Sequence, residues 1–364
     1  MIKILYTIPN FDTAGSGKAL LKIATRLDPE RFESHICCMH DRGAFFKVVR
    51  ASGIPVHLFP YTADMSRRLR GLVHVVRTAR FFRQIRPDII HSFHYAPDYS
   101  EALATLLAGV KWVYTKKNMN WGGASRNGWW LRSWMAHGIV AQNTDMLRDF
   151  FPGWKKVKLI PRGVDLDEFR PNGEMVYPLP REYRWIVCVA NLVPVKGVET
   201  LLEAFHRVAD QYPDWRLAIV GDDRSDYAAQ LKMTFAELVQ TQQAVFTGKV
   251  LNVKDYLRQA DLFVLPTLNK GRKEGSPVSL LEAMATGLPV LASAVPGIRD
   301  QLAHFPELLF EAGNVEVLTK KLATWLERDD ATRRRMGQAL RREAEARFSI
   351  EREVRDHEEF YLSL

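Results

Sequence analysis

The sequence has little cysteine and no long apolar run. Its three cysteines, Cys37, Cys38 and Cys188, include no Cys-x-x-Cys pair. This odd number without metal-ligand spacing excludes a disulfide scaffold and a zinc module, and is typical of free thiols in a reducing compartment. No window approaches the roughly 18 apolar residues of a membrane span, and the short apolar stretch at residues 1–8 is not expected to be a signal peptide. These absences predict a cytoplasmic protein, at most peripheral on the inner face of a membrane.

Basic residues outnumber acidic ones. The 364 residues contain 51 Lys and Arg against 42 Asp and Glu, a formal net charge of +9. With 47% hydrophobic and 26% charged residues the composition is globular, which excludes a disordered or collagen-like chain. A basic balance favours anionic partners such as a nucleotide or an acidic membrane surface. Because no nucleic-acid-binding motif accompanies it, we expect no nucleic-acid partner.

Short apolar runs alternate with amphipathic stretches in two successive series. The expected strands are residues 3–8, 34–39, 56–59, 88–93, 111–115, 138–142 and 157–160, then residues 185–190, 216–220, 244–247, 261–265 and 289–292. This alternation is typical of parallel strands joined by helical crossovers. We therefore predict an α/β protein with two Rossmann-like, doubly wound parallel-sheet domains that face a central cleft.

A turn-rich stretch at residues 161–184 separates the two series. It divides the chain into an N-terminal domain, residues 1–165, and a C-terminal domain, residues 166–347. Residues 315–364 are expected to be entirely helical, and the last helix, about residues 348–364, is expected to pack back on the first domain. Ligands of doubly wound sheets bind at the carboxyl ends of the strands, so functional residues should directly follow strands.

The most informative segment follows the expected strand 261–265. Ser276 and Pro277 predict a helix start, as a capping residue followed by a first-turn proline, and Gly275 lets a ligand approach the backbone. The free amides of this turn, up to Val278, form an anion site suited to a diphosphate.

Two glutamates lie beside this expected anion site. Glu274 immediately precedes the turn and Glu282 lies on the helix. Carboxylates here would repel phosphates, so we expect them to accept hydrogen bonds from hydroxyl groups, as a sugar and a ribose on either side of a diphosphate would supply. The structural alternative is a capped amphipathic helix with exposed glutamates.

A glycine-rich turn follows the first expected strand. It is not a P-loop, because Asp12 and Ala19 stand where the first glycine and the magnesium-binding hydroxyl are required. What remains is a turn at a helix start, in which Gly15 and Ser16 offer a second approach to phosphate. The alternative is a glycine that only turns the chain.

His91 and His94 end the expected strand 88–93. A histidine at such a place is as often a structural residue as a functional one. The further ligands that a metal would require do not accompany these histidines, so we expect no catalytic metal.

Two further segments are rich in aromatic or basic residues. Four of the nine tryptophans lie in residues 121–134, interleaved with arginines, a pattern that suits sugar stacking, an anionic acceptor, a membrane anchor or packing between helices. An arginine-rich helix is expected at residues 67–86 and could add to a membrane surface. Such a helix more often packs its apolar stripe on the sheet. The members of that stripe are Leu69, Leu72, Val73, Val76 and Phe82.

The spacing Glu274-(x)7-Glu282 within EGSPVSLLEAMATGLPV resembles the signature of retaining glycosyltransferases of the GT-B fold, family 4 (glycosyl transferases group 1). Residues 87–91, 161–165 and 189–197 are similar to further elements of that family, so the resemblance runs nearly end to end. It implies a nucleotide-sugar donor, with Lys196 at the diphosphate, Glu274 at the sugar and Glu282 at the ribose.

The resemblance also assigns the remaining site residues. It implies Gly15 in the first-domain glycine loop, and a histidine near the sugar hydroxyls, His94 in preference to His91. Asn191 stands where the family often has arginine, and Arg272 or Lys273 would supply that charge.

The activity implied is that of a retaining, metal-independent glycosyltransferase of hexosyltransferase type. A UDP-sugar is favoured as donor over a GDP-sugar, no cofactor is expected besides this co-substrate, and the acceptor is a glycan or lipid-linked hydroxyl in polysaccharide, lipopolysaccharide or glycolipid biosynthesis. Two alternatives stay open. One is an epimerase or hydrolase of nucleotide sugars on the same fold, and the other is a non-catalytic peripheral membrane-binding protein.

Overall fold

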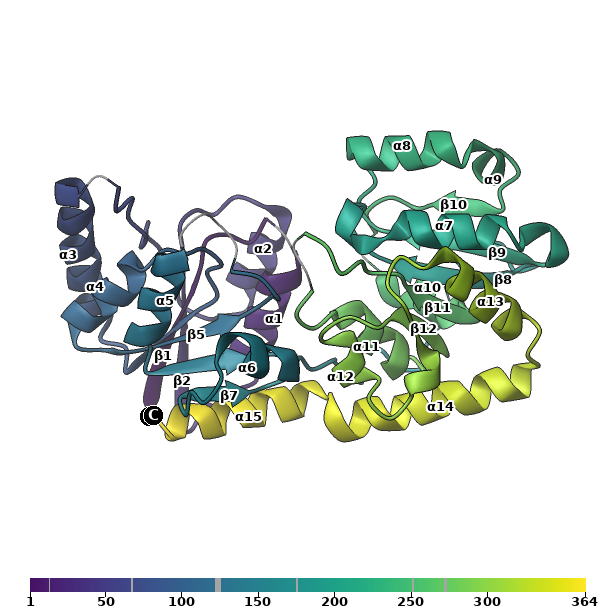
Figure 1. The fold of residues 1–364 in the computed structure, drawn as a ribbon. Helices are drawn as coiled ribbons and strands as arrows, with labels where there is room; N and C mark the ends of the chain where they lie inside the picture. The colour runs from purple at the N-terminus through teal and green to yellow at the C-terminus, as the bar shows by residue number, and fades with distance from the viewer. Residues whose placement is uncertain (13, 67, 122–125, 175, 251, 272–273) are drawn as a thin grey trace. The chain divides into compact units, whose positions relative to one another are not determined.

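The computed structural model describes residues 1–12, 14–66, 68–121, 126–174, 176–250, 252–271 and 274–364. The chain divides into two compact units. Unit 1 is Met1–Pro161 together with Ile350–Leu364, and unit 2 is Arg162–Ser349. Each is built on one parallel sheet covered by helices (Figure 1). Within the described residues, no helix is long and apolar enough to cross a membrane.

Unit 1 contains a seven-stranded sheet in the order β3-β2-β1-β4-β5-β6-β7, and every neighbouring pair is parallel. The strands are β1 (Ile2–Ile8), β2 (Phe32–Cys38), β3 (Val56–Leu58), β4 (Ile89–Ser92), β5 (Lys111–Lys116), β6 (Gly138–Ala141) and β7 (Val157–Leu159). The order reverses between β1 and β4, so the loops that follow these two strands flank the switch point of the sheet.

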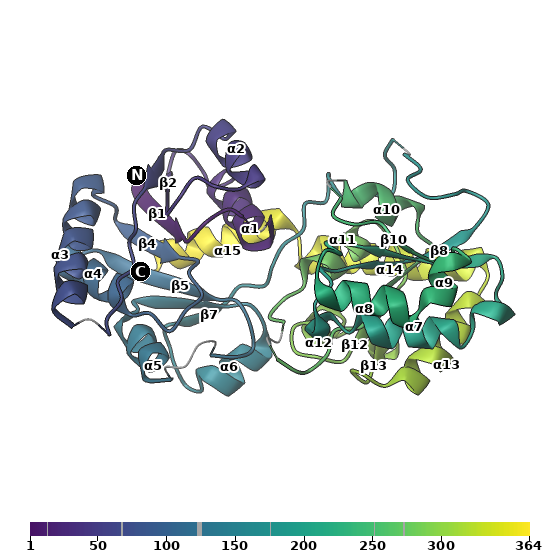
Figure 2. The same cartoon turned by 90° about the horizontal axis from the view of Figure 1, so that it is seen from above.

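The helices of unit 1 cover both faces of its sheet (Figure 2). They are α1 (Ala14–Ala24), α2 (Ala44–Ala51), α3 (Arg68–Ile85), α4 (Ser100–Ala108), α5 (Arg126–Met135), α6 (Thr144–Phe150) and α15 (Ile350–Leu362). One core cluster joins the sheet to α1, α2 and α15, and another joins it to α3, α4 and α5. Val354, Phe360 and Tyr361 anchor α15 in the first of these clusters, which fixes the end of the chain on unit 1.

The expected packing of α3 is wrong. Leu69, Leu72, Val73 and Val76 are exposed, and only Phe82 of the expected stripe is buried. The helix instead buries Gly71, Val75, Thr78, Ala79 and Phe82. These positions also recur at helical spacing, so α3 carries two apolar stripes and packs the one with smaller side chains, which lets the helix approach its neighbours closely.

Unit 2 contains a six-stranded parallel sheet in the order β10-β9-β8-β11-β12-β13. Its strands are β8 (Arg184–Val189), β9 (Trp215–Val220), β10 (Ala244–Phe246), β11 (Leu262–Leu265), β12 (Val290–Ser293) and β13 (Leu309–Phe310). The order reverses between β8 and β11. This is the strand order of a dinucleotide-binding sheet, and its switch point lies between the loops after β8 and β11.

The helices and turns of unit 2 lie on both sides of this sheet (Figure 2). They are η1 (Pro194–Lys196), α7 (Val198–His206), η2 (Ala209–Gln211), α8 (Asp226–Thr234), α9 (Ala236–Gln240), α10 (Val253–Gln259), α11 (Val278–Ala285), α12 (Ile298–Gln301), η3 (Pro306–Leu308), α13 (Val315–Leu326) and α14 (Asp330–Arg347). The expected helical tail is therefore three helices with breaks before α14 and before α15. The predicted fold class is confirmed, as both units are doubly wound parallel α/β sheets.

Candidate functional site

In unit 2, a lysine and a glutamate meet at the switch point of the sheet. Lys196 ends η1 in the loop after β8, and Glu274 lies in the loop after β11. The Lys196 Nζ and the Glu274 Oε1 form an ion pair with side chains 20% and 23% exposed. The pair is thus partly open to a ligand, at the edge of the sheet where such folds bind one.

Backbone contacts hold the two loops of this pair together. The Leu268 amide donates to the Val195 carbonyl at 2.8 Å. Gly197 has a φ of +65°, and a Cβ there would lie 2.0 Å from the Pro266 carbonyl oxygen. The loops approach so closely that Lys196 is held beside the β11 loop before any ligand binds.

The loop that leads into α11 is anchored by α12. Helix α11 begins at Val278, with Pro277 at the capping position, so the expected cap by Ser276 is wrong. The Ser276 hydroxyl instead accepts a hydrogen bond from Gln301 Nε2 at 3.1 Å, and the Pro277 carbonyl accepts one from the same amide at 3.2 Å. The first amides of α11 have no partner within the helix and remain suited to an anion.

The other predicted residues of this half differ in their exposure. Gly275 and Pro277 are buried, whereas Glu282, on the second turn of α11, is partly exposed. Asn191 is exposed in the loop after β8. Arg272 and Lys273 lie outside the described residues.

Substitution of Gly297 tests whether the position of the loop before α11, residues 274–277, matters for nucleotide binding. Gly297 has a φ of +79°, and a Cβ there would lie 2.1 Å from the Gly275 carbonyl oxygen. Gly297→Ala is therefore expected to displace residues 274–277 and to lower stability by about 1–3 kcal/mol, with at least about tenfold weaker nucleotide binding. Chemical denaturation and calorimetric titration measure the two effects.

Gly313→Ala is the matched control for Gly297→Ala. Gly313 has the same φ of +79°, but the nearest atom to its Cβ position is a Leu268 side-chain carbon at 3.4 Å. The control carries the same backbone strain without a clash against the β11 loop. Equal effects of the two substitutions on nucleotide binding would contradict the anchoring role of Gly297.

In unit 1, the side chains of Ser16, His94 and Lys117 follow strands β1, β4 and β5 near the switch point of the sheet. Gly15 and Ser16 lie at the start of α1, and His94 follows β4. Lys117, directly after β5, connects them: its Nζ donates to the Ser16 hydroxyl at 3.3 Å and to the Phe93 carbonyl. Sequence reasoning missed Lys117, and its position directly after a strand was the available signal.

His91 is a structural residue, which corrects its assignment to the site. Its side chain is fully buried, with Nδ1 at 2.6 Å from the Tyr361 hydroxyl and Nε2 at 2.8 Å from the Thr115 hydroxyl. Both ring nitrogens are thus engaged in the core between β4, β5 and α15.

His94 is the histidine at the edge of the sheet. Burial, with the charges of Arg132 and Lys117, lowers the pKa of His94 to about 3. Its ring is therefore neutral at physiological pH and is available to donate or accept a hydrogen bond rather than to act as a cation. Among the described residues, Nδ1 of His94 is buried without a hydrogen-bond partner.

A buried polar network holds the loop after β4, which contains His94. The Arg132 guanidinium donates to the carbonyls of Asp98 and His94 at 3.0 and 3.1 Å and to the Ser92 hydroxyl at 3.1 Å. That hydroxyl donates to the Glu101 carboxylate at 2.7 Å. Burial raises the pKa of Glu101, and the charge of Arg132 opposes the rise. Arg132 is therefore a positioning residue for the loop after β4.

The tryptophan-rich segment divides between core and surface. Trp129 is buried and Trp121 packs against it, whereas Trp130 and Trp134 are exposed and stack on each other. Residues 122–125 lie outside the described residues. The Lys116 ammonium points into the same aromatic cluster, 4.2 Å from the Phe150 ring centre, and burial lowers its pKa to about 7.

No group of three or more His, Cys, Asp or Glu in the described part of the chain is placed to hold a metal ion. Two nearby carboxylates that could be considered for a metal, Asp165 and Asp167, lie in the connection before β8. There the Asp165 carboxylate accepts a hydrogen bond from the Glu168 amide at 3.1 Å, which makes it a turn residue.

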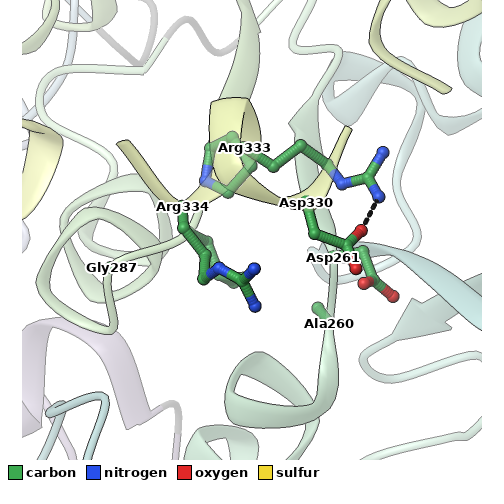
Figure 3. A pocket seen from close by; sticks show the side chains of 8 residues that line it. Ala260, Asp261, Gly287, Asp330, Arg333 and Arg334 are labelled. Carbon is green, nitrogen blue, oxygen red and sulfur yellow. Dashed lines mark hydrogen bonds and ion pairs between the residues drawn. The ribbon is translucent and has the colours of Figure 1, made fainter. Parts of the chain in front are cut away.

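A small hollow of unit 2 lies away from the candidate site (Figure 3). Asp261 and Pro289 line it, and they precede β11 and β12, so it is at the amino edge of the sheet. The Asp261 carboxylate accepts a hydrogen bond from the Trp185 amide at 2.9 Å, and Arg333 pairs with Asp330. Asp261, Arg333 and Asp330 thus each have a partner within the protein, and the hollow lies where α14 packs on the sheet.

Comparison with known proteins identifies both halves of the chain. The family "Glycosyltransferase Family 4" matches residues 13–168, and the family "Glycosyl transferases group 1" matches residues 173–343. The sulfoquinovosyl transferase SQD2 of Arabidopsis thaliana is 34% identical over 210 residues, which cover 52% of this chain and 37% of that protein. A GDP-mannose-dependent monoacylated alpha-(1-6)-phosphatidylinositol monomannoside mannosyltransferase of Corynebacterium glutamicum is 30% identical over 202 residues, covering 53% of this chain and 52% of that one. The matches thus span between about a third and a half of these curated relatives.

Solved structures show the same fold over the full length. A glycosyltransferase from Rickettsia africae has a TM-score of 0.85 at 20% identity, covering 100% of this chain and 98% of that one. Anabaena HepE in complex with UDP and glucose has a TM-score of 0.83 at 20% identity, with 100% of both chains covered. From the two family matches and this fold, the chain is a member of the family 4, group 1 glycosyltransferases and has the two Rossmann-like units of the GT-B fold.

Proposed function

We propose that the protein transfers a sugar from a nucleotide diphosphate donor to an acceptor hydroxyl, with retention of the anomeric configuration and without a catalytic metal. The observation that carries the proposal is the Lys196–Glu274 pair beside the start of α11, at the switch point of the unit 2 sheet. A cation and free helix amides suit the diphosphate, and the carboxylate suits the hydroxyls of the sugar.

The chemistry follows from positioning and charge. When a diphosphate binds, Lys196 exchanges part of its contact with Glu274 for phosphate oxygens. Lys196 and the first amides of α11 then stabilise the charge that grows on the leaving diphosphate. Glu282 is proposed to hold the ribose. In unit 1, neutral His94, with Lys117 beside it, is proposed to face the transferred sugar.

A UDP-sugar is the favoured donor and a GDP-sugar the second candidate. The UDP complex of Anabaena HepE supports the first, and the GDP-mannose-dependent relative supports the second. We propose a glycan or lipid-linked acceptor bound by unit 1 at the cytoplasmic face of a membrane. The name of the Corynebacterium glutamicum relative, a phosphatidylinositol monomannoside mannosyltransferase, supports a lipid-linked acceptor.

Product analysis tests this proposal. With UDP-glucose, UDP-galactose or GDP-mannose in the presence of a chelator, free nucleoside diphosphate is expected only after a glycolipid or polysaccharide acceptor fraction is added. NMR of the glycosylated product is expected to show the donor's anomeric configuration. Nucleotide release without acceptor would indicate a hydrolase, conversion of the sugar without release would indicate an epimerase, and either result would overturn the proposal.

A further inference from the structure

The basic excess of the chain lies entirely in unit 1. Unit 1 has 26 Lys and Arg against 16 Asp and Glu, a net charge of +10, whereas unit 2 has 25 against 26, a net charge of −1, and together they give the +9 of the whole chain. Electrostatic attraction to an anionic surface is therefore a property of unit 1.

The outer side of α3 exposes apolar side chains to water. Leu69, Leu72, Val73 and Val76 are 81%, 48%, 71% and 44% exposed, and their spacing places them in one stripe along the helix. Arg83 of α3 donates a hydrogen bond to the Leu107 carbonyl of α4, which places the exposed Leu106 and Leu107 near the C-terminal end of α3, beyond this stripe. We call these six apolar residues, together with the exposed Arg70, Arg77, Arg80 and Arg83, the α3 face.

The α3 face contains one sign of charge. Helix α3 has no aspartate or glutamate anywhere in its sequence RLRGLVHVVRTARFFRQI. Arg70 and Arg77 lie beside the apolar stripe, and Arg80 and Arg83 continue it towards the end of the helix. The long stems of these arginines can lie along apolar surface while their guanidinium groups reach phosphate oxygens. An apolar stripe bordered by cations is the pattern of helices that lie in the headgroup region of anionic bilayers.

We infer that unit 1 docks on an anionic lipid bilayer through the α3 face. The leucine and valine side chains enter the boundary between headgroups and acyl chains, and the arginines contact the lipid phosphates. A second copy of the chain suits this face less well, because a two-fold contact of α3 with itself would oppose arginines to arginines. The inference does not rest on the proposed activity, since docking requires neither donor nor acceptor.

Vesicle sedimentation with the full chain tests the inference. Binding is expected to vesicles of phosphatidylcholine with about 30% phosphatidylglycerol, to be much weaker on pure phosphatidylcholine, and to fall steeply when salt is raised to about 0.5 M. No binding to anionic vesicles would overturn the inference.

Two variants separate the apolar and charged parts of the α3 face. Leu69→Gln/Val73→Gln is expected to weaken binding to anionic vesicles at least about tenfold. Arg70→Gln/Arg80→Gln is expected to weaken it about tenfold to thirtyfold, since each arginine near the surface contributes roughly a fivefold factor. Because all four side chains are exposed, the midpoint of thermal unfolding should stay within about 2 °C of the wild-type value.

Unit 2 supplies the matched controls. Met233 is 79% exposed and Arg334 and Arg335 are exposed, so Met233→Gln and Arg334→Gln/Arg335→Gln remove equivalent groups from the other unit. These controls are expected to bind vesicles like the wild type. Equal loss in controls and α3 variants would overturn the assignment to the α3 face. So would a concentration-dependent dimer in sedimentation velocity that only Leu69→Gln/Val73→Gln dissociates, without vesicle binding by the wild type.

Discussion

Replacing Glu274 with glutamine is expected to lower the rate of sugar transfer by about 10²–10³-fold while nucleoside diphosphate binding is retained. Glutamine keeps the shape of the side chain and removes its charge. The carboxylate lies against Lys196 at the start of α11, where it is placed to accept hydrogen bonds from sugar hydroxyls. Without it, Lys196 loses an internal partner and remains available to the diphosphate, so affinity for UDP or GDP should be equal or higher.

Steady-state nucleotide release and calorimetric titration measure the two effects of Glu274→Gln separately. Glu316→Gln, at an exposed glutamate in the first turn of α13, removes the same charge from unit 2 and should leave both unchanged. Transfer by Glu274→Gln within about threefold of the wild-type rate would remove Glu274 from the proposed site.

Replacing Arg132 with methionine is expected to lower the free energy of unfolding by about 3–5 kcal/mol, because it leaves the buried Glu101 without its compensating charge. Arg132 is fully buried, and its guanidinium donates to the backbone of the His94 loop as well as to Ser92. Since the charge of Arg132 lowers the pKa of His94, that pKa should rise in the variant from its value of about 3. Chemical denaturation and an NMR titration of the histidine measure the two changes.

Arg207→Met is the control for Arg132→Met. Arg207 pairs with Glu203 at the surface, with side chains 45% and 37% exposed, so its loss should cost less than about 1 kcal/mol. In the double variant Arg132→Met/Glu101→Gln the losses should be less than additive, because the second change removes the uncompensated carboxylate. An Arg132→Met variant as stable as Arg207→Met would contradict the role of the buried network.

Much of the fold could be predicted because local patterns determine it. All twelve expected strands are strands of the two sheets, since buried parallel strands are apolar runs between helices. The two-residue strand β13 has no such run and was not predicted. The orientation of α3 could not be derived, because Leu69 and Val75 belong to two stripes with the same helical spacing. Which stripe is buried depends on how closely the neighbouring helix packs.

Part of the candidate site could also be proposed from local sequence patterns. Residues 274–282 form a local motif whose turn and helix lie in one stretch of chain, and Lys196 could be placed by resemblance. The separation of His91 from His94 depends on Tyr361, which lies 270 residues away from His91, and no local pattern contains that contact. Lys117 reaches Ser16 across 101 residues. The Glu101–Ser92–Arg132 network was missed because charged residues are mostly at the surface.

The measurement that most directly tests the donor site is thermal unfolding of the full chain with UDP, GDP and ADP in the presence of a chelator. At about 100 times its dissociation constant, a bound nucleotide stabilises the protein by about 2.7 kcal/mol, a shift that is readily detected. One of the three nucleotides is expected to raise the unfolding temperature without metal, and Lys196→Ala is expected to abolish this shift. If no nucleotide raises it, or if the shift is unchanged in Lys196→Ala, the proposed donor site is contradicted.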